Sequence, residues 1–185
     1  MVSMSSAPWT VVLGYSHPLA FALAVRDALD VPCALEIPPV VRRPTLATPP
    51  GVTGEHVPDL WQHWWETTLS LTRDDAPSIP LVPAEPLAPI VEDNLQTLHR
   101  WSSAHKREVA RVSNPFRNAP RMRDAVHEHE RQSGIRIGGF RLQVTALPVT
   151  GSFFHPTTND HILVSVDLLA DRAEYVRRVI AHVTS

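Results

Sequence analysis

A serine stands where a buried strand is expected to turn into a helix. Ser16 follows the β-branched run WTVVLGY and precedes the helical pattern HPLAFALAVRDALD. A nucleophile elbow exposes its serine at such a junction, which makes Ser16 the candidate nucleophile of a small hydrolase. Pro18 stands where the elbow has its second glycine, however, and serine is a preferred N-cap of helices. Only His182 and Asp167 follow in an order that suits a base and its orienting acid, so a helix cap is the alternative interpretation.

Histidines form a second candidate site. The chain has 10 of them, and His127 and Glu130 are three residues apart on one expected helix, where both side chains share a face. Zinc needs a further ligand from another element, and His155 and His161 are the candidates for it. The sequence contains no HExxH motif, and a solvated polar helix face is the structural alternative. We therefore expect no cofactor, with these four residues as the place where a metal would bind in a metal-dependent hydrolase.

A basic tract runs from Arg100 to Arg123. On the helix expected there, Arg100, Arg107 and Arg111 share one face, as a phosphate-binding surface requires. Trp101 lies within the tract and would stack on an unpaired base. The alternative is a solvated face that pairs with the acidic N-terminal half of the chain. Of the 17 basic residues only one is lysine, an arginine bias typical of GC-rich coding, so nucleic-acid binding is possible but not favoured.

Tryptophans suggest a contact with another protein. Trp61, Trp64 and Trp65 lie on one expected helix and Trp101 on the next. Tryptophan is enriched at the energetic centres of interfaces, although packing between two helices of the same chain is the alternative. Trp64 and Trp65 point about 100° apart around a helix, so burying both requires cover over a wide arc. This motivates the hypothesis that another chain covers one side of the helix.

The N-terminal third positions the first of these residues. Residues 9–15 predict a buried strand, and Ser16 with Pro18 predicts the start of the helix that follows. Residues 31–37, VPCALEI, predict a second strand, which would complete a βαβ unit.

Two proline-rich connections interrupt the middle of the chain, over residues 38–58 and 74–89. In the second, five prolines are spaced by three, which is the period of polyproline II. Their rings would line one edge of a stiff rod: Pro77, Pro80, Pro83, Pro86 and Pro89. We interpret the rod as a strap across the protein's own surface, with a ligand for an SH3-like or WW-like groove as the alternative.

Three helices are expected in the central part, over residues 58–72, 90–112 and 120–132, the last ending at Gly134. Apolar and polar residues of the 90–112 helix repeat at alternating steps of four and three, which is a heptad seam with a polar centre. The seam consists of Val91, Leu95, Leu98, Ser102, His105, Val109 and Val112. Three heptads favour a helix pair within one chain over a free coiled coil.

The C-terminal third carries the clearest strand pattern. In GGFRLQVTA apolar and polar residues alternate, which predicts a half-buried strand with one wet face. After HPTTND, expected to be a turn, the run HILVSV predicts an antiparallel partner. A last helix begins near Asp171, where Asp171 and Glu174 have the spacing of a capping box.

Composition and pattern together indicate one α+β or small α/β domain over residues 1–185, with a mixed three- to four-stranded sheet and about five helices. Hydrophobic residues make up 43% and charged residues 19%, which excludes a disordered chain. No apolar run is long enough for a membrane span, no secretory signal pattern opens the sequence, and Cys33 is the only cysteine, so we expect a cytoplasmic protein. We expect a non-catalytic interaction or accessory protein that binds a protein partner or itself through the Trp-bearing helix and the heptad seam.

Overall fold

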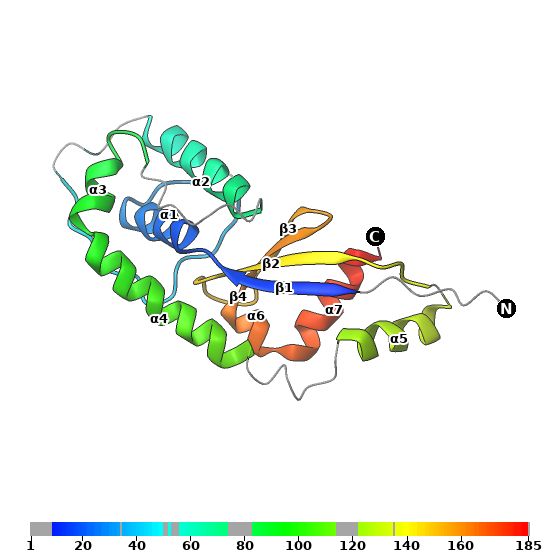
Figure 1. Ribbon diagram of the computed structural model, residues 1–185. Coiled ribbons are helices and arrows are strands. Elements are labelled where there is room, and N and C mark those ends of the chain that lie inside the picture. The colour runs from blue at the N-terminus through cyan, green and yellow to red at the C-terminus, as the bar shows by residue number, and fades with distance from the viewer. Residues whose placement is uncertain are drawn as a thin grey trace.

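One four-stranded sheet, in the strand order β1-β2-β4-β3, organises the computed structural model (Figure 1). β1 (Thr10–Tyr15), β2 (Arg141–Leu147) and β4 (His161–Ser165) run parallel, and β3 (Phe154–Thr158) runs antiparallel to β4. With seven helices in the described part of the chain, this is a mixed-sheet fold of the α/β type, as predicted. The structure describes residues 9–33, 35–49, 52, 56–73, 83–113, 122–134 and 136–184.

The first helix, α1 (His17–Ala28), begins as its capping residues predict. The hydroxyl of Ser16 accepts a hydrogen bond from the N–H of Leu19 at 3.3 Å, and Pro18 occupies the first turn. Every residue from Leu19 to Arg26 is buried. A helix that is covered on all sides belongs to a core, so α1 forms the centre of a group of helices instead of lying on the surface.

The strand predicted over residues 31–37 is wrong for the described part of that segment, which runs irregularly. The guanidinium of Arg26, on α1, donates to the carbonyl oxygens of Ile37 and of the following proline at 2.9 and 2.8 Å. The carboxylate of Asp27 accepts from the N–H of Val40 at 2.7 Å. Side chains of α1 thus satisfy backbone groups that a neighbouring strand would otherwise satisfy. The parallel neighbour of β1 comes instead from the C-terminal third of the chain.

The polyproline rod predicted over residues 74–89 is wrong where the structure describes it. Residues 85–87 form a turn, in which the N–H of Leu87 donates to the carbonyl of Ala84 at 3.0 Å, and Pro89 lies in the first turn of α3 (Ala88–Asp93). Proline is tolerated there because an N–H in the first turn of a helix has no acceptor within the helix. Pro77 and Pro80 lie outside the described residues. The connection over residues 38–58 is irregular as predicted in its described part before α2 (Val57–Arg73), apart from a single bridge between Val40 and Val149.

The helix predicted from Ile90 to Val112 is in fact two helices, α3 and α4 (Leu95–Ser113), with a break at Asn94. The Asn94 amide nitrogen donates to the carbonyls of Ile90 and Ala47, both at 2.8 Å, and its oxygen accepts from the N–H of Ala47 at 2.8 Å. This buried side chain fastens the preceding connection to the joint between the helices. The heptad pattern continues through the break, so periodicity alone did not reveal it.

The strand pairing in the C-terminal third differs from the prediction. β4 is not the antiparallel partner of β2 but its parallel neighbour. The segment expected to be a turn largely forms β3, which pairs antiparallel with β4 and shifts register between Pro156 and Thr158. A proline inside a short polar segment indicates a turn, yet it is also tolerated on an edge strand, where no neighbour needs its N–H.

Three helices complete the C-terminal part: α5 (Met122–Ser133), α6 (Val166–Ala170) and α7 (Arg172–Val183). α5 ends before Gly134, which adopts a positive φ of 71°, and α7 is capped by Asp171, whose carboxylate accepts from the N–H of Glu174. Both boundaries confirm their predictions. The short α6, capped by Ser165, was not predicted.

Both faces of β2 are covered at its C-terminal end, which corrects the expected wet face. Leu142, Val144 and Ala146 are buried on one face as predicted, but Thr145 and Leu147 are also buried on the other. Only the beginning of that second face reaches solvent.

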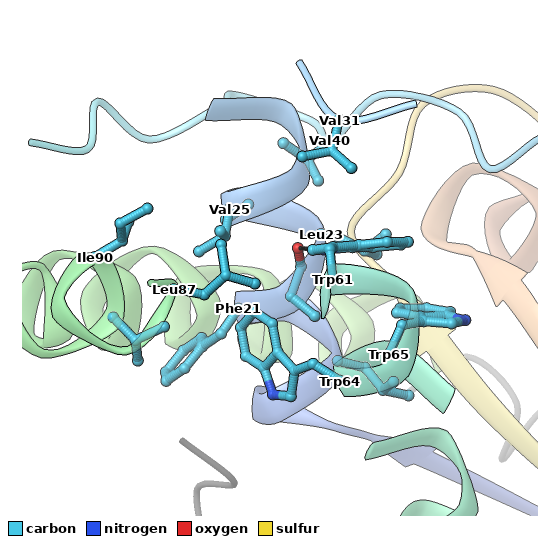
Figure 2. Close-up of a cluster of buried hydrophobic side chains, with 14 of the residues drawn as sticks. Phe21, Leu23, Val25, Val31, Val40, Trp61, Trp64, Trp65, Leu87 and Ile90 are labelled. Carbon is cyan, nitrogen blue, oxygen red and sulfur yellow. Dashed lines mark hydrogen bonds between the residues drawn. The ribbon is translucent and has the colours of Figure 1, made fainter. Parts of the chain in front are cut away.

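Two hydrophobic clusters form the core, and α4 contributes to both. The first, shown in part in Figure 2, gathers side chains of α1, α2, α3 and the start of α4. The second lies between the sheet and α6 and α7, and includes Val109 near the end of α4. Leu98 belongs to the first cluster. Ser102 and His105, the polar centre of the predicted seam, lie between these two contacts. In the part of the chain that is described, no helix is long and apolar enough to cross a membrane.

Candidate functional site

The end of β1, the beginning of α1 and the middle of α4 meet in a group of polar side chains. The Ser102 hydroxyl, on α4, lies 2.8 Å from Nδ1 of His17 and 3.1 Å from the hydroxyl of Tyr15. Ser102 is fully buried, whereas the His17 and Tyr15 side chains are half-buried. In parallel sheets, ligands bind beyond the carboxyl ends of the strands, and this is that edge of the sheet.

Positive charge surrounds this group. Burial, and then the nearby charges of Lys106 and His99, lower the pKa of His17. Burial also raises the pKa of Tyr15, so the phenol keeps its proton. His99 is exposed and places its ring 6.1 Å from that of His17, centre to centre. His17 is therefore mainly neutral near pH 7, and a negative charge bound beside it would favour its protonated form.

The second polar residue of the seam, His105, joins α4 to the connection that precedes α2. Its Nε2 lies 3.1 Å from the carbonyl oxygen of Val41, and the indole of Trp101 donates to the same oxygen at 3.2 Å. Burial lowers the pKa of His105, although its hydrogen bond to Val41 acts in the opposite direction. His105 and Trp101 thus serve to position a loop.

Ser16 fills the role of a helix cap, with no catalytic partner among the described residues. Its hydroxyl contacts the N–H of Leu19 and, at 3.3 Å, the hydroxyl of Thr72. In the described part of the chain no histidine or carboxylate touches it, and the residue is buried. Nothing in these surroundings would remove the proton of Ser16, as a serine nucleophile requires.

The four metal candidates are dispersed. His127 and Glu130 form a pair on α5, with Nδ1 and Oε2 3.1 Å apart. His155 stacks on Phe153. His161 is buried in the sheet, where its two ring nitrogens lie 2.9 and 2.7 Å from the hydroxyls of two threonines, Thr145 and Thr157. Across the described residues, no group of three or more histidine, cysteine or acidic side chains is arranged to hold a metal ion.

The tryptophans of α2 face the interior of their own chain. Trp61, Trp64 and Trp65 have exposed fractions of 0%, 3% and 0%, and the first and last stack on each other at 5.7 Å (Figure 2). The Trp61 indole donates to the carbonyl oxygen of Ala22 on α1 at 2.7 Å. Trp101 is half-buried. α1 and the elements packed around it cover the wide arc of α2 that carries these tryptophans, so their burial requires no second chain.

The basic face of α4 is exposed but partly neutralised. The Arg111 guanidinium donates twice to the carboxylate of Glu108, at 2.9 and 2.6 Å. Arg100 and Arg107 are exposed. This arrangement leaves two of the three predicted anion-binding arginines directed to solvent with no ion pair to the described part of the chain.

The two edges of the sheet differ in a way that bears on partners. β3 has Pro156 at its centre and a shift of register, both of which obstruct the addition of another strand. β1 is uncharged, contains no proline, and is six residues long. The N–H of Thr10 donates to Phe140 next to β2, so the alternate residues Val11, Leu13 and Tyr15 direct their backbone groups to the outer edge. No strand in the described part of the chain pairs with that edge.

Two cavities open on the sheet lobe. One, of about 350 Å³, lies between His155, Phe153 and the segment from Leu35 to Ile37. The other, of about 340 Å³, lies between Val11 and Leu13 of β1 and Arg172 and Tyr175 of α7. Ser152 and His155 both line the first cavity, but no hydrogen bond joins their side chains in the described part of the chain. No histidine is among the described residues that line the second.

Comparison with known proteins yields no relative: no family model, no curated protein and no solved structure matches this chain. The function must therefore be argued from the chain itself.

Sequence reasoning missed His17, His99 and Tyr15 as members of a common group. The available signal was Ser102, a small polar residue at an inward position of an otherwise apolar seam. Such a residue needs a hydrogen-bonding partner, but the sequence does not reveal which element supplies it.

Proposed function

We propose that this chain is a non-catalytic interaction protein that associates with a second copy of itself through the outer edge of β1. The observation that supports the proposal is the contrast between the sheet edges: β3 is obstructed by Pro156, whereas β1 is open, apolar and uncharged. Native proteins usually blunt an exposed edge strand, because its free backbone groups recruit other chains. An edge left without such protection fits a strand that receives a partner.

A second copy suits this edge better than a charged peptide does. Antiparallel pairing of two β1 strands around a two-fold axis brings identical uncharged segments together, so no like charges oppose each other. Val12, with 41% of its side-chain surface exposed, would gain apolar contacts across that axis. The tryptophans of α2 and the seam residues of α4 from Leu98 to Val109 are turned toward the core, which moves the proposal to β1.

Light scattering after size-exclusion chromatography tests the proposal. We expect a weak dimer whose fraction rises with concentration, because a single strand pair buries less surface than a standard interface. Val12→Lys places like charges across the axis and shifts the protein to monomer, while Val12→Thr keeps strand propensity without charge and retains the dimer. Leu95→Lys is the matched control, because Leu95 is 40% exposed at the first residue of α4, which lies beside α3 and far from β1 (Figure 1).

Hydrogen exchange locates the contact. The outward N–H groups of Val11, Leu13 and Tyr15 should become protected as concentration rises. A monomer at every concentration, or an equal loss of dimer in Leu95→Lys, contradicts the proposal. Cys33 is half-buried and free, so the measurements also use Cys33→Ser to exclude a disulfide-linked dimer. A reducing, cytoplasmic location is the environment that we propose for a chain with this single thiol.

A further inference from the structure

Two imidazoles meet beside the buried Ser102 hydroxyl, and Lys106 follows on the same helix. His99 and Lys106 are seven residues apart on α4, so they project from one face about two turns apart, with Ser102 between them. His17 approaches from α1, and its Nδ1 lies 2.8 Å from the Ser102 oxygen. The ring of His17 lies 6.1 Å from that of His99.

The two imidazoles are held in place by contacts that leave ring nitrogens available. His17 uses Nδ1 for Ser102, and its ring meets Tyr15 edge-on at 5.4 Å. His99 meets the ring of Phe21 edge-on at 4.9 Å. Within the described residues, Nε2 of His17 and both nitrogens of His99 form no hydrogen bond. The two rings are thus held in position, while three of their nitrogens have no hydrogen bond to the described part of the chain.

Two side chains of α4 act on His17 in the same direction. Lys106 and His99 disfavour its protonation, and no carboxylate of the described part of the chain offsets them. The α1 terminus itself contributes little, because Ser16 already occupies the N–H of Leu19 and Pro18 has none. The positive potential therefore comes from side chains, and a bound anion would offset it.

We infer that His17, His99 and Lys106 form a binding site for a small phosphate-type dianion, with the Ser102 and Tyr15 hydroxyls fixing the position of His17. Hereafter this group is called the anion site. A tetrahedral dianion matches one permanent cation flanked by two imidazoles, each of which gains a proton or donates a hydrogen bond on binding. The groups that would contact the ligand lie on α4 and α1, and only Tyr15, which helps to fix His17, also belongs to β1.

The anion site differs from the face that carries Arg100 and Arg107. Those arginines follow His99 and Lys106 by one position each, which turns them by about 100° around the helix. They lack a partner element opposite them, whereas His17 stands across from His99 and Lys106. The matched comparison is therefore Lys106→Gln against Arg107→Gln, since each removes one charge from adjacent exposed positions.

A titration with inorganic phosphate, followed through the histidine ring signals in nuclear magnetic resonance, tests the inference. Ionic strength is held constant with chloride, and sulfate provides a dianion whose charge does not vary with pH. We expect saturable shifts of His17 and His99, and a rise of about one pH unit in the titration midpoint of His17. Lys106→Gln and His99→Gln should each weaken binding by about tenfold, while Arg107→Gln changes it less than twofold.

Three results would overturn the inference: shifts that do not saturate, equal shifts in chloride, or equal weakening by Arg107→Gln and Lys106→Gln. Phosphate and sulfate acting alike identify a general oxyanion site; a preference for a phosphate monoester over free phosphate identifies a phosphorylated small molecule as the ligand. Val12→Lys should bind phosphate as the unmodified chain does, which separates this result from the fate of the proposed dimer.

Discussion

Ser102 Oγ lies 2.8 Å from Nδ1 of His17, and this contact joins the middle of α4 to the first residue of α1. The same hydroxyl reaches Tyr15 at the end of β1. One small side chain thus connects the sheet, the helical group and the long helix that contributes to both hydrophobic clusters.

Removing that hydroxyl should destabilise the fold out of proportion to its size. Ser102→Ala leaves the phenol of Tyr15 and Nδ1 of His17 without their common partner, so we expect a loss of about 1–3 kcal/mol in unfolding free energy. Urea denaturation measures it. Ser103→Ala is the control, because Ser103 is half-buried with no hydrogen bond to the described part of the chain. Equal effects of the two substitutions would mean that the contact carries no special stability.

The tryptophans of α2 offer a second, internally controlled comparison. Trp61→Phe removes the indole that donates to Ala22 at 2.7 Å, whereas the Trp65 indole nitrogen is buried with no hydrogen-bond partner among the described residues. Both substitutions remove the same volume, so the difference isolates the hydrogen bond. We expect Trp61→Phe to cost about 1 kcal/mol more than Trp65→Phe in unfolding free energy. A larger loss in Trp65→Phe would contradict this.

Stability should fall as the solution becomes mildly acidic. Burial lowers the pKa of His17, His105 and His155 in the folded chain, so the unfolded chain binds protons more readily. Their contribution is fully present above the ordinary histidine pKa of about 6.5 and is lost as the pH drops below it. Denaturation at pH 7.5 and 5.0 measures the loss.

A variant can separate the histidines' share from that of the carboxylates. His155 stacks on Phe153 and makes no hydrogen bond to the described residues, and burial lowers its pKa, so His155→Gln should make the drop smaller. His63→Gln, on the exposed face of α2, should leave it unchanged. A drop of the same size in His155→Gln and the unmodified chain would show that His155 does not contribute.

Local signals in the sequence predicted local structure well. Ser16, Gly134 and Asp171 mark helix boundaries because each acts on backbone groups within a few residues of itself. The wrong predictions concern segments whose conformation depends on residues far away in the sequence. Residues 31–37 have the composition of a strand, but the carbonyl of Ile37 accepts a hydrogen bond from Arg26 and does not pair in the sheet. The helix break lies at Asn94, whose side chain binds the backbone of Ala47, and the periodicity of the sequence does not indicate such a contact.

The candidate sites divide along the same line. Ser102 and His105 are visible in the sequence as polar residues inside an apolar seam, but their partners His17 and Val41 come from elements that only folding brings near. The residues chosen for their chemical type alone, Ser16 and His127, proved to have local partners on their own or adjacent turns.

The pairing of β1 with β2 has a consequence for biosynthesis. β1 leaves the ribosome well before its neighbour in the sheet, which is made only after the helices α1 to α5. The helical group built on α1, α2 and α3 can gather while translation continues, but the sheet must wait for the last third of the chain. Such distant pairing slows folding and keeps an adhesive strand uncovered during synthesis. Crowded nascent chains would therefore meet at the same strand before the sheet is complete.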